Sequence, residues 1–363
     1  MTTDALLATL AGLQVGPRDP HFAPGLFRSY RTHHRLPYRR PDDNIFFPAL
    51  IDLTLNGLLR DLAPGQREVA ERIQAGVRAN YPAYASLRRP ELYNFYRTDP
   101  PAPFPYGRVL RRFRRFRLAE DADDTCIIGA NLSDLPAAHV RFLREELVRF
   151  SNHDGRAPHL RSPYSELAAY GTWFGTGVMP VVPDVCVLCN ILYFSLRRGL
   201  PLNATDRDSL AFIRLALERE DILRRPYAVS PNYLNPLVQL YHVARLWSAL
   251  PDPAEHLPRA LILEQLERVE PLADSLFPRL LLAASRLKLG APAVEPVYTE
   301  AELLAAHAHF PYFIAPLLSG THSGLLTRLS AWRFLQLEYV CPAYPVVVGL
   351  EVRGLLAGSR VQG

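Results

Sequence analysis

Residues 119–131 combine a cluster of carboxylates with an apolar segment. The stretch AEDADDTCIIGAN places Asp121, Asp123 and Asp124 in the pattern D-x-D-D, and Thr125 follows directly. Like charges a few ångströms apart cannot all ionise, so one carboxyl of such a cluster keeps its proton at neutral pH. Apolar walls strengthen this effect, whereas the positive end of a helix opposes it. The cluster is a candidate Brønsted acid, and the alternative is a set of ionised helix caps that accept backbone N–H bonds.

Helical periodicity dominates the remainder of the chain. Strand-like alternation of β-branched residues is nearly absent, apart from PVVVGLEV at 345–352. Prolines stand mostly between the periodic segments, where loops begin or helices take their first turn. Apolar residues recur at helical spacing in seven segments: 44–62, 138–152, 186–200, 208–223, 236–250, 259–276 and 278–290. We therefore expect an all-α fold.

The expected helices fall into two kinds, and their starts repeat. Segments such as HVRFLREELVRF carry one charged face and are typical of an outer layer, whereas TCIIGANL and DVCVLCNILYF are apolar nearly all round. The start at 124–128 matches that at 184–188, and 43–47 has the same shape. Paired helices that repeat need neighbours to bury their faces. We expect residues 41–363 to form one α/α toroid, a barrel of paired inner and outer helices, after an N-terminal extension at 1–40; an open solenoid is the alternative.

The repeat also predicts where the inner helices meet. Inner helices should begin near Asp43, Asp124, Asp184 and Asn235, with their N-terminal ends gathered at one rim.

In this setting DADDT resembles the D-x-D-D-T signature of class II terpene cyclases, the squalene-hopene cyclase superfamily, which also use α/α barrels. The resemblance implies that Asp123 protonates an alkene or epoxide of an isoprenoid substrate. Asp121 would polarise or orient that acid, and Asp124 would support the helix start. The Q-x-x-x-G-x-W repeats of triterpene cyclases are missing. Those enzymes build the site between two helical domains, so here a loop, a dimer partner or the terminal extension would have to close the cavity.

A carbocation formed in such a site would be guided by aromatic faces, which attract cations without attacking them. Aromatic side chains next to helix starts are more often core residues than ligand contacts. The candidate substrate-binding residues are Tyr93, Phe95, Tyr96, Trp173, Phe174, Tyr233, Tyr241 and His242.

A metal site is the other chemistry that the sequence suggests. Asp184 and Cys186 resemble the Asp-x-Cys pair that binds zinc in protein prenyltransferase β subunits, and His242 would be a third ligand, with Cys189 one turn from Cys186. Because the same helix start recurs at Cys126, repetition explains the pair without a metal. We therefore expect no zinc and no other cofactor, except Mg²⁺ if the substrate carries a diphosphate.

Composition limits the remaining classes. The 363 residues are 48% hydrophobic and 21% charged, with a net charge of +5, as in an ordinary globular protein. No apolar run of about 18 residues is present, and the N-terminus lacks the basic start of a secretory signal, so we expect a cytoplasmic protein with buried thiols. No G-x-S-x-G, Walker A or dinucleotide fingerprint is present.

The basic run RVLRRFRRFRL at 108–118 precedes the acidic motif. Its arginines could bind a diphosphate, lie peripherally on a membrane, or pair with Glu120 and Asp121. No motif that reads nucleic acid accompanies it, so we expect no nucleic-acid partner. The favoured hypothesis is a protonation-initiated cyclase of an isoprenoid. A non-catalytic toroid that binds an apolar ligand or a protein is second, and a zinc-dependent prenyltransferase-like enzyme is third; the oligomeric state stays open.

Overall fold

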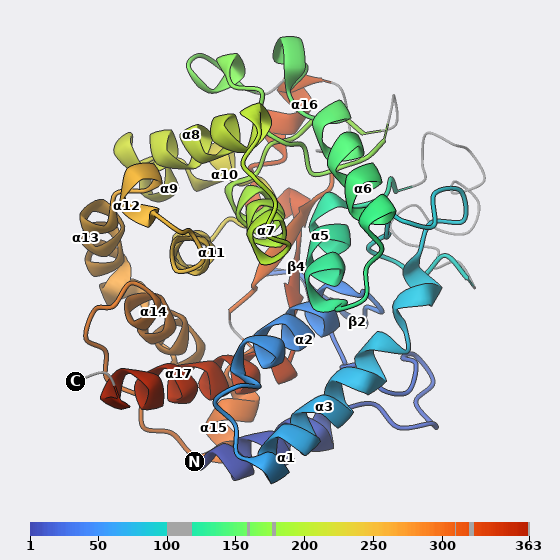
Figure 1. The fold of residues 1–363 in the computed structure, drawn as a ribbon, viewed down its shortest axis with the longest axis vertical. Helices are drawn as coiled ribbons and strands as arrows, with labels where there is room; N and C mark the ends of the chain where they lie inside the picture. The colour runs from blue at the N-terminus through green and yellow to red at the C-terminus, as the bar shows by residue number, and fades with distance from the viewer. Residues whose placement is uncertain (100–117, 158–159, 176–178, 309, 319–322, 362–363) are drawn as a thin grey trace.

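The computed structural model describes residues 1–99, 118–157, 160–175, 179–308, 310–318 and 323–361. Most of this part of the chain is helical, as the periodicity predicts (Figure 1). Six of the described helices pack against one another in cyclic order, each against the next and the last against the first. They are α2 (Phe46–Leu58), α5 (Ala122–Asn131), α7 (Val185–Arg197), α11 (Pro236–Trp247), α14 (Leu276–Lys288) and α17 (Ala343–Val361).

A second set of helices lies outside these six (Figure 1). In α3 only Ala70, Ile73, Gln74 and Val77 are buried, which is the i, i+3, i+4, i+7 spacing of one helix face. By contrast, all ten residues of α5 are buried. The outer set is α1 (Thr3–Leu13), α3 (Pro64–Arg78), α6 (Ala137–Arg149), α8 (Ala204–Glu218), α13 (Arg259–Val269) and α15 (Glu300–Ala305).

Short helices connect these elements. The connecting α-helices are α9 (Asp221–Arg224), α10 (Pro226–Val229), α12 (Pro253–His256) and α16 (Gly324–Leu329). The 3₁₀ turns are η1 (Tyr81–Tyr84), η3 (His153–Gly155), η4 (Tyr164–Glu166), η5 (Glu270–Leu272) and η6 (Arg333–Leu335).

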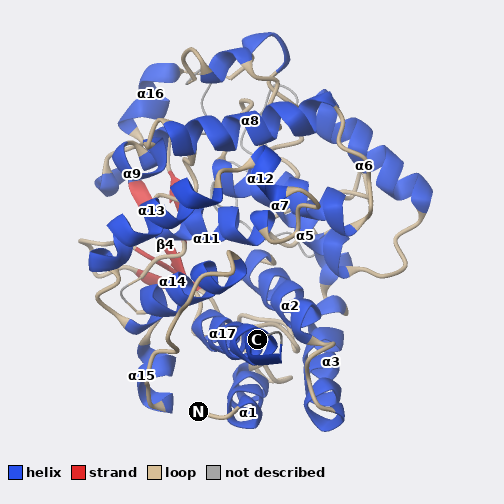
Figure 2. Ribbon diagram, turned by 60° about the vertical axis from the view of Figure 1, so that its left-hand side comes forward, coloured by secondary structure: helices blue, strands red, loops and turns tan. Residues whose placement is uncertain are grey.

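The prediction of an all-α fold is wrong in one respect, because a four-stranded antiparallel sheet is present in the order β2-β1-β4-β3. Its strands are β1 (Tyr30–Thr32), β2 (Arg39–Pro41), β3 (Phe313–Pro316) and β4 (Gln336–Val340). Figure 2 shows these strands, in red, together in one small area of an otherwise helical molecule. Three to five residues are too few to show a period of two, so the sequence pattern carries no signal for them.

The one strand-like segment of the sequence, 345–352, lies inside α17 instead. Its valines and leucines are buried among α1, α2 and α14. Because neighbours enclose this helix, tertiary packing outweighs the β propensity of Val346, Val347 and Val348.

Residues 1–40 contact several distant elements. Helix α1 packs against α17 and α3, and β1 pairs with β4 in the register Tyr30 to Val340. The predicted boundary at residue 40 falls within β2. Among the described residues, no helix combines the length and apolar character needed to cross a bilayer.

Candidate active site

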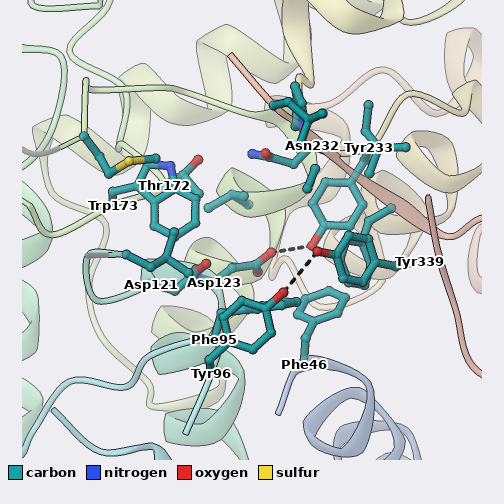
Figure 3. Close-up of a pocket in the computed structure, with 18 residues that line it drawn as sticks. Phe46, Phe95, Tyr96, Asp121, Asp123, Thr172, Trp173, Asn232, Tyr233 and Tyr339 are labelled. Carbon is teal, nitrogen blue, oxygen red and sulfur yellow. Dashed lines mark hydrogen bonds between the residues drawn. The ribbon is translucent and has the colours of Figure 1, made fainter. Parts of the chain in front are cut away.

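A cavity of about 260 Å³ lies where four helices of the cycle begin (Figure 3). Phe46 is the first residue of α2, Asp123 and Val187 lie in the first turns of α5 and α7, and Tyr233 precedes the Asn235 cap of α11. The N-terminal ends of these four helices thus share one cavity, as the repeat predicts. The sheet supplies a further wall through β3 and through Tyr339 of β4.

The walls of this cavity, which we call the aspartate cavity, are mainly aromatic. The rings stand around the carboxyl of Asp123, and the labelled side chains of Figure 3 come from segments far apart in the chain. The aromatic lining residues are Phe46, Phe95, Tyr96, Trp173, Tyr233, Phe313 and Tyr339.

Asp121 is the cap of α5. One of its carboxyl oxygens, Oδ1, accepts the backbone N–H groups of Asp123 at 2.7 Å and of Asp124 at 3.4 Å. Burial raises the pKa of Asp121 well above its ordinary value, the charge of Asp123 adds to this, and the two N–H bonds act in the opposite direction. The capping interpretation of the motif therefore holds for Asp121, whose side chain also lines the cavity.

Asp123 faces the cavity with an exposed fraction of 4%. Its Oδ2 accepts the hydroxyl of Tyr233 at 2.5 Å, and its Oδ1 accepts the side-chain amide of Asn190. Asn190 in turn accepts a hydrogen bond from Arg245. Burial raises the pKa of Asp123 to about 6, while the bonds from Tyr233 and Asn190 and the charge of Arg245 lower it. This carboxyl therefore takes up its proton at a higher pH than an ordinary aspartate does, and it does so at the wall of a mainly aromatic cavity.

Asp124 lies behind the cavity wall and is completely buried. Neither of its carboxyl oxygens has a hydrogen-bond partner within the described structure. Burial, followed by the charges of Asp121 and Asp123, raises its pKa well above the ordinary value. The resemblance assigns to Asp124 the role of supporting the helix start. The structure gives the capping bonds to the side chain of Asp121 instead.

Asp184 caps α7 in the same way and also fixes the loop that carries Tyr233. Its Oδ1 accepts the backbone N–H of Cys186 at 2.9 Å and the hydroxyl of Ser230 at 2.5 Å, and its Oδ2 accepts the N–H of Asn232 at 2.9 Å. Burial raises the pKa of Asp184 to about 6. Both oxygens are thus engaged in positioning the segment that places Tyr233 against Asp123.

The zinc alternative depends on Asp184, Cys186 and His242. Cys186 and Cys189 are buried free thiols whose pKa values burial raises, and Nδ1 of His242 bonds to the Val238 carbonyl at 2.9 Å. In the part of the chain that the structure describes, no three His, Cys, Asp or Glu side chains are grouped so as to hold a metal ion.

Four of the predicted substrate-binding residues line the aspartate cavity: Phe95, Tyr96, Trp173 and Tyr233. The other four are absent from its wall because each packs in the core. Phe174 stacks edge-on against Phe150, and the Tyr241 hydroxyl donates to Glu351 at 2.7 Å. Tyr93 is a partly buried core residue whose carbonyl accepts the N–H of Asp121, and the centre of the His242 ring lies 5.3 Å from that of Tyr233.

Several residues of the site were not predicted. Asn190 and Arg245 are buried polar residues inside apolar helices, a signal that the sequence did contain. Phe313 and Tyr339 come from strands that the sequence does not indicate. The arginines at 108–117 fall outside the described residues.

A second hydrogen-bonded acid lies behind Tyr96. The hydroxyl of Tyr96 donates to Asp42 at 3.1 Å. The same hydroxyl is 3.1 Å from that of Tyr339 (Figure 3). Arg31 pairs with Asp42 at 2.9 Å. Burial raises the pKa of Asp42 to about 6, with the charge of Arg31 opposing the change.

Comparisons with models of protein families, with curated proteins and with solved structures find no match for this chain.

Proposed function

We propose that this protein is a protonation-initiated cyclase of the class II terpene-cyclase type, with Asp123 as its general acid and an isoprenoid as its substrate. The observation that carries the proposal is a carboxyl with a pKa of about 6 on the wall of a cavity whose other walls are mainly aromatic. A carboxyl in that state keeps a far larger protonated fraction near neutral pH than an ordinary aspartate does, and it is still acidic enough to donate the proton.

The proposed reaction begins with transfer of the Asp123 proton to an alkene carbon. The alkene π electrons form the new C–H bond, the carboxyl O–H bond breaks, and the other alkene carbon becomes a cation. A second alkene of the same molecule then attacks that cation and closes a ring. The cyclised cation then loses a proton to water, and the Asp123 carboxylate regains one from solvent, so the reaction needs no oxidant and no second substrate.

The neighbours of Asp123 support both halves of this transfer. Tyr233 and Asn190 donate to the carboxylate that remains after the proton leaves. Burial is what raises the pKa of Asp123 to about 6, so a fraction of this carboxyl stays protonated near neutral pH. The faces of Phe95, Trp173 and Phe313 are available to stabilise the cation.

We further propose that the cyclic order of α2, α5, α7, α11, α14 and α17 is that of an α/α toroid, with the sheet covering the rim where the aspartate cavity opens. The closed sequence of helix contacts and the outer helices around it support this arrangement. In this arrangement β3 and β4 supply part of the cavity wall, so the cavity of a single helical domain needs no second domain to close it.

The test is conversion of farnesyl, geranylgeranyl and squalene-type substrates by the wild type and by Asp123→Asn. The variant keeps the shape and removes the acid, so turnover should fall by roughly 10²–10⁴-fold or more. Asp134→Asn, at an exposed position, is the matched control and should retain activity. Melting curves check that all three proteins fold.

The second candidate is a non-catalytic protein that binds an apolar ligand in the same cavity, which its aromatic lining favours. In that case the isoprenoids bind and change the fluorescence of Trp173 but are recovered unchanged. If wild type and Asp123→Asn both return all of the substrate unchanged, the cyclase proposal is wrong and the binding protein takes its place. Proton transfer of this kind needs no cofactor, and Mg²⁺ enters the proposal only with a diphosphate-bearing substrate.

A further inference from the structure

A second cavity, of about 390 Å³, shares no lining residue with the aspartate cavity. Three distant segments form it: the loop between α6 and α7, the residues around α9 and α10, and the end of α16. Four arginines line it together with a single carboxylate, that of Asp221. The arginines are Arg161, Arg219, Arg225 and Arg328, and we call the site the arginine cavity.

The carboxylate of the arginine cavity is already fully engaged. Asp221 is buried and accepts Nε and Nη2 of Arg225, each at 2.9 Å. The hydroxyl of Tyr164 donates to it at 2.7 Å, and Nε of Arg219 lies 3.5 Å from it. Asp221 therefore holds Arg225 in place, but it can neutralise no more than one positive charge.

The other arginines leave an excess of positive charge. Arg161 and Arg328 are exposed, and neither pairs with a carboxylate among the described residues. Four arginines thus line a cavity that holds one carboxylate, and an anion in the cavity would offset their excess positive charge. The floor between them is fixed, since the hydroxyl of Tyr227 donates to the Thr327 carbonyl at 3.0 Å.

We propose that the arginine cavity binds a diphosphate group, either as the free ion or as part of a small soluble molecule. Planar guanidinium groups donate two parallel hydrogen bonds to phosphate oxygens, which makes arginine the preferred residue for this anion. The multiple charges of a diphosphate match the excess charge, whereas a single carboxylate would leave it largely uncompensated. The proposal does not depend on catalysis at Asp123.

The test is a calorimetric titration of the full chain with inorganic diphosphate. Arg161→Gln combined with Arg328→Gln should raise Kd by about tenfold or more, because each lost contact is a charge-assisted hydrogen bond. Arg60→Gln combined with Arg141→Gln removes the same charge from exposed positions outside the cavity. That control should change Kd by no more than about twofold.

A parallel titration with uridine diphosphate separates the two sources of the group. Equal affinity for both probes would indicate the free ion, and tighter binding of the nucleotide would indicate an esterified ligand; either supports the proposal. Absence of saturable binding by both probes, or equal losses in the two double variants, would overturn it. Asp123→Asn should bind inorganic diphosphate as the wild type does, because the two cavities share no lining residue.

Discussion

The proton of Asp123 links the chemistry of the site to the stability of the fold. Burial raises the pKa of this carboxyl from 3.8 to about 6, so the folded protein binds the proton more tightly than the unfolded chain does. Stability contributed by this proton is present at low pH and is lost as the pH rises through the folded value. Asp123→Asn has no titratable carboxyl at this position, so its stability does not fall in this way as the pH rises.

We therefore predict that Asp123→Asn gains stability relative to the wild type between about pH 4 and about pH 6. The difference in free energy of unfolding should approach roughly 3 kcal/mol, at 1.36 kcal/mol per pKa unit. Above about pH 6 it should stay constant. Urea unfolding of both proteins across this range measures it. A difference that does not change with pH would mean that Asp123 titrates near its ordinary value in the folded state.

Burial raises the pKa of Asp123, and the short hydrogen bond from Tyr233 lowers it. Tyr233→Phe removes a donor that favours the ionised carboxyl, so the pKa of Asp123 should rise further. The upper limit of the active pH range should move upward by about one pH unit, since a bond to a charged group is worth roughly 1.5–3 kcal/mol. NMR titration of the Asp123 carboxyl measures the shift directly. A lower melting temperature without any shift would show that Tyr233 only packs.

The start of α5 shows how far an element could be predicted from the sequence. The pattern D-x-D-D before an apolar run correctly indicates a helix start with carboxylates around it. It does not indicate which aspartate caps, because that depends on which one adopts the extended backbone of a cap, and Asp121 does. Asp123 is then turned toward the cavity and Asp124 toward the core.

The cap itself can be tested with two substitutions at one position. Asp121→Asn keeps an oxygen for the N–H groups of Asp123 and Asp124, whereas Asp121→Ala leaves them without that partner. The alanine variant should be less stable than the asparagine variant by about 0.5–2 kcal/mol in chemical denaturation. Equal stabilities would show that the bonds to Asp121 do not hold the helix start.

Elements that form through distant pairing were beyond the sequence analysis. Strand β1 has no alternation of apolar and polar residues, and it exists because β4, far along the chain, supplies its hydrogen bonds. Phe313 and Tyr339 enter the aspartate cavity through this sheet. Helix positions came from local periodicity, but five of the eighteen residues that line the cavity lie in strands whose long-range pairing leaves no local pattern.

At the scale of the whole molecule, the cycle of helices depends on close contacts between neighbours. A Cβ atom at Gly129 of α5 would lie 2.9 Å from the ring of Phe194, which is fully buried in α7. A Cβ at Gly12 of α1 would meet nothing within 4 Å. The two glycines therefore differ in their neighbours, although both lie in helices.

We predict opposite effects of alanine at these two positions. Gly12→Ala should stabilise the protein by up to about 1 kcal/mol through helix propensity. Gly129→Ala should destabilise it by roughly 1–3 kcal/mol, because the ring of Phe194 must move within a packed core. Thermal and urea unfolding of both variants measure the signs. A stabilising Gly129→Ala would mean that α5 and α7 are packed less tightly than their contact indicates.

The pairing of β1 with β4 also determines when the protein can be completed during its synthesis. Residues 30–32 leave the ribosome about 300 residues before residues 336–340, their partners. At roughly 5–20 residues per second, the edge of β1 that pairs with β4 waits on the order of tens of seconds for its partner. Helices α1 and α2 wait about as long, because both pack against α17. Early segments must therefore remain soluble without their final partners, and the aspartate cavity gains its last walls only when nearly the entire chain has been made.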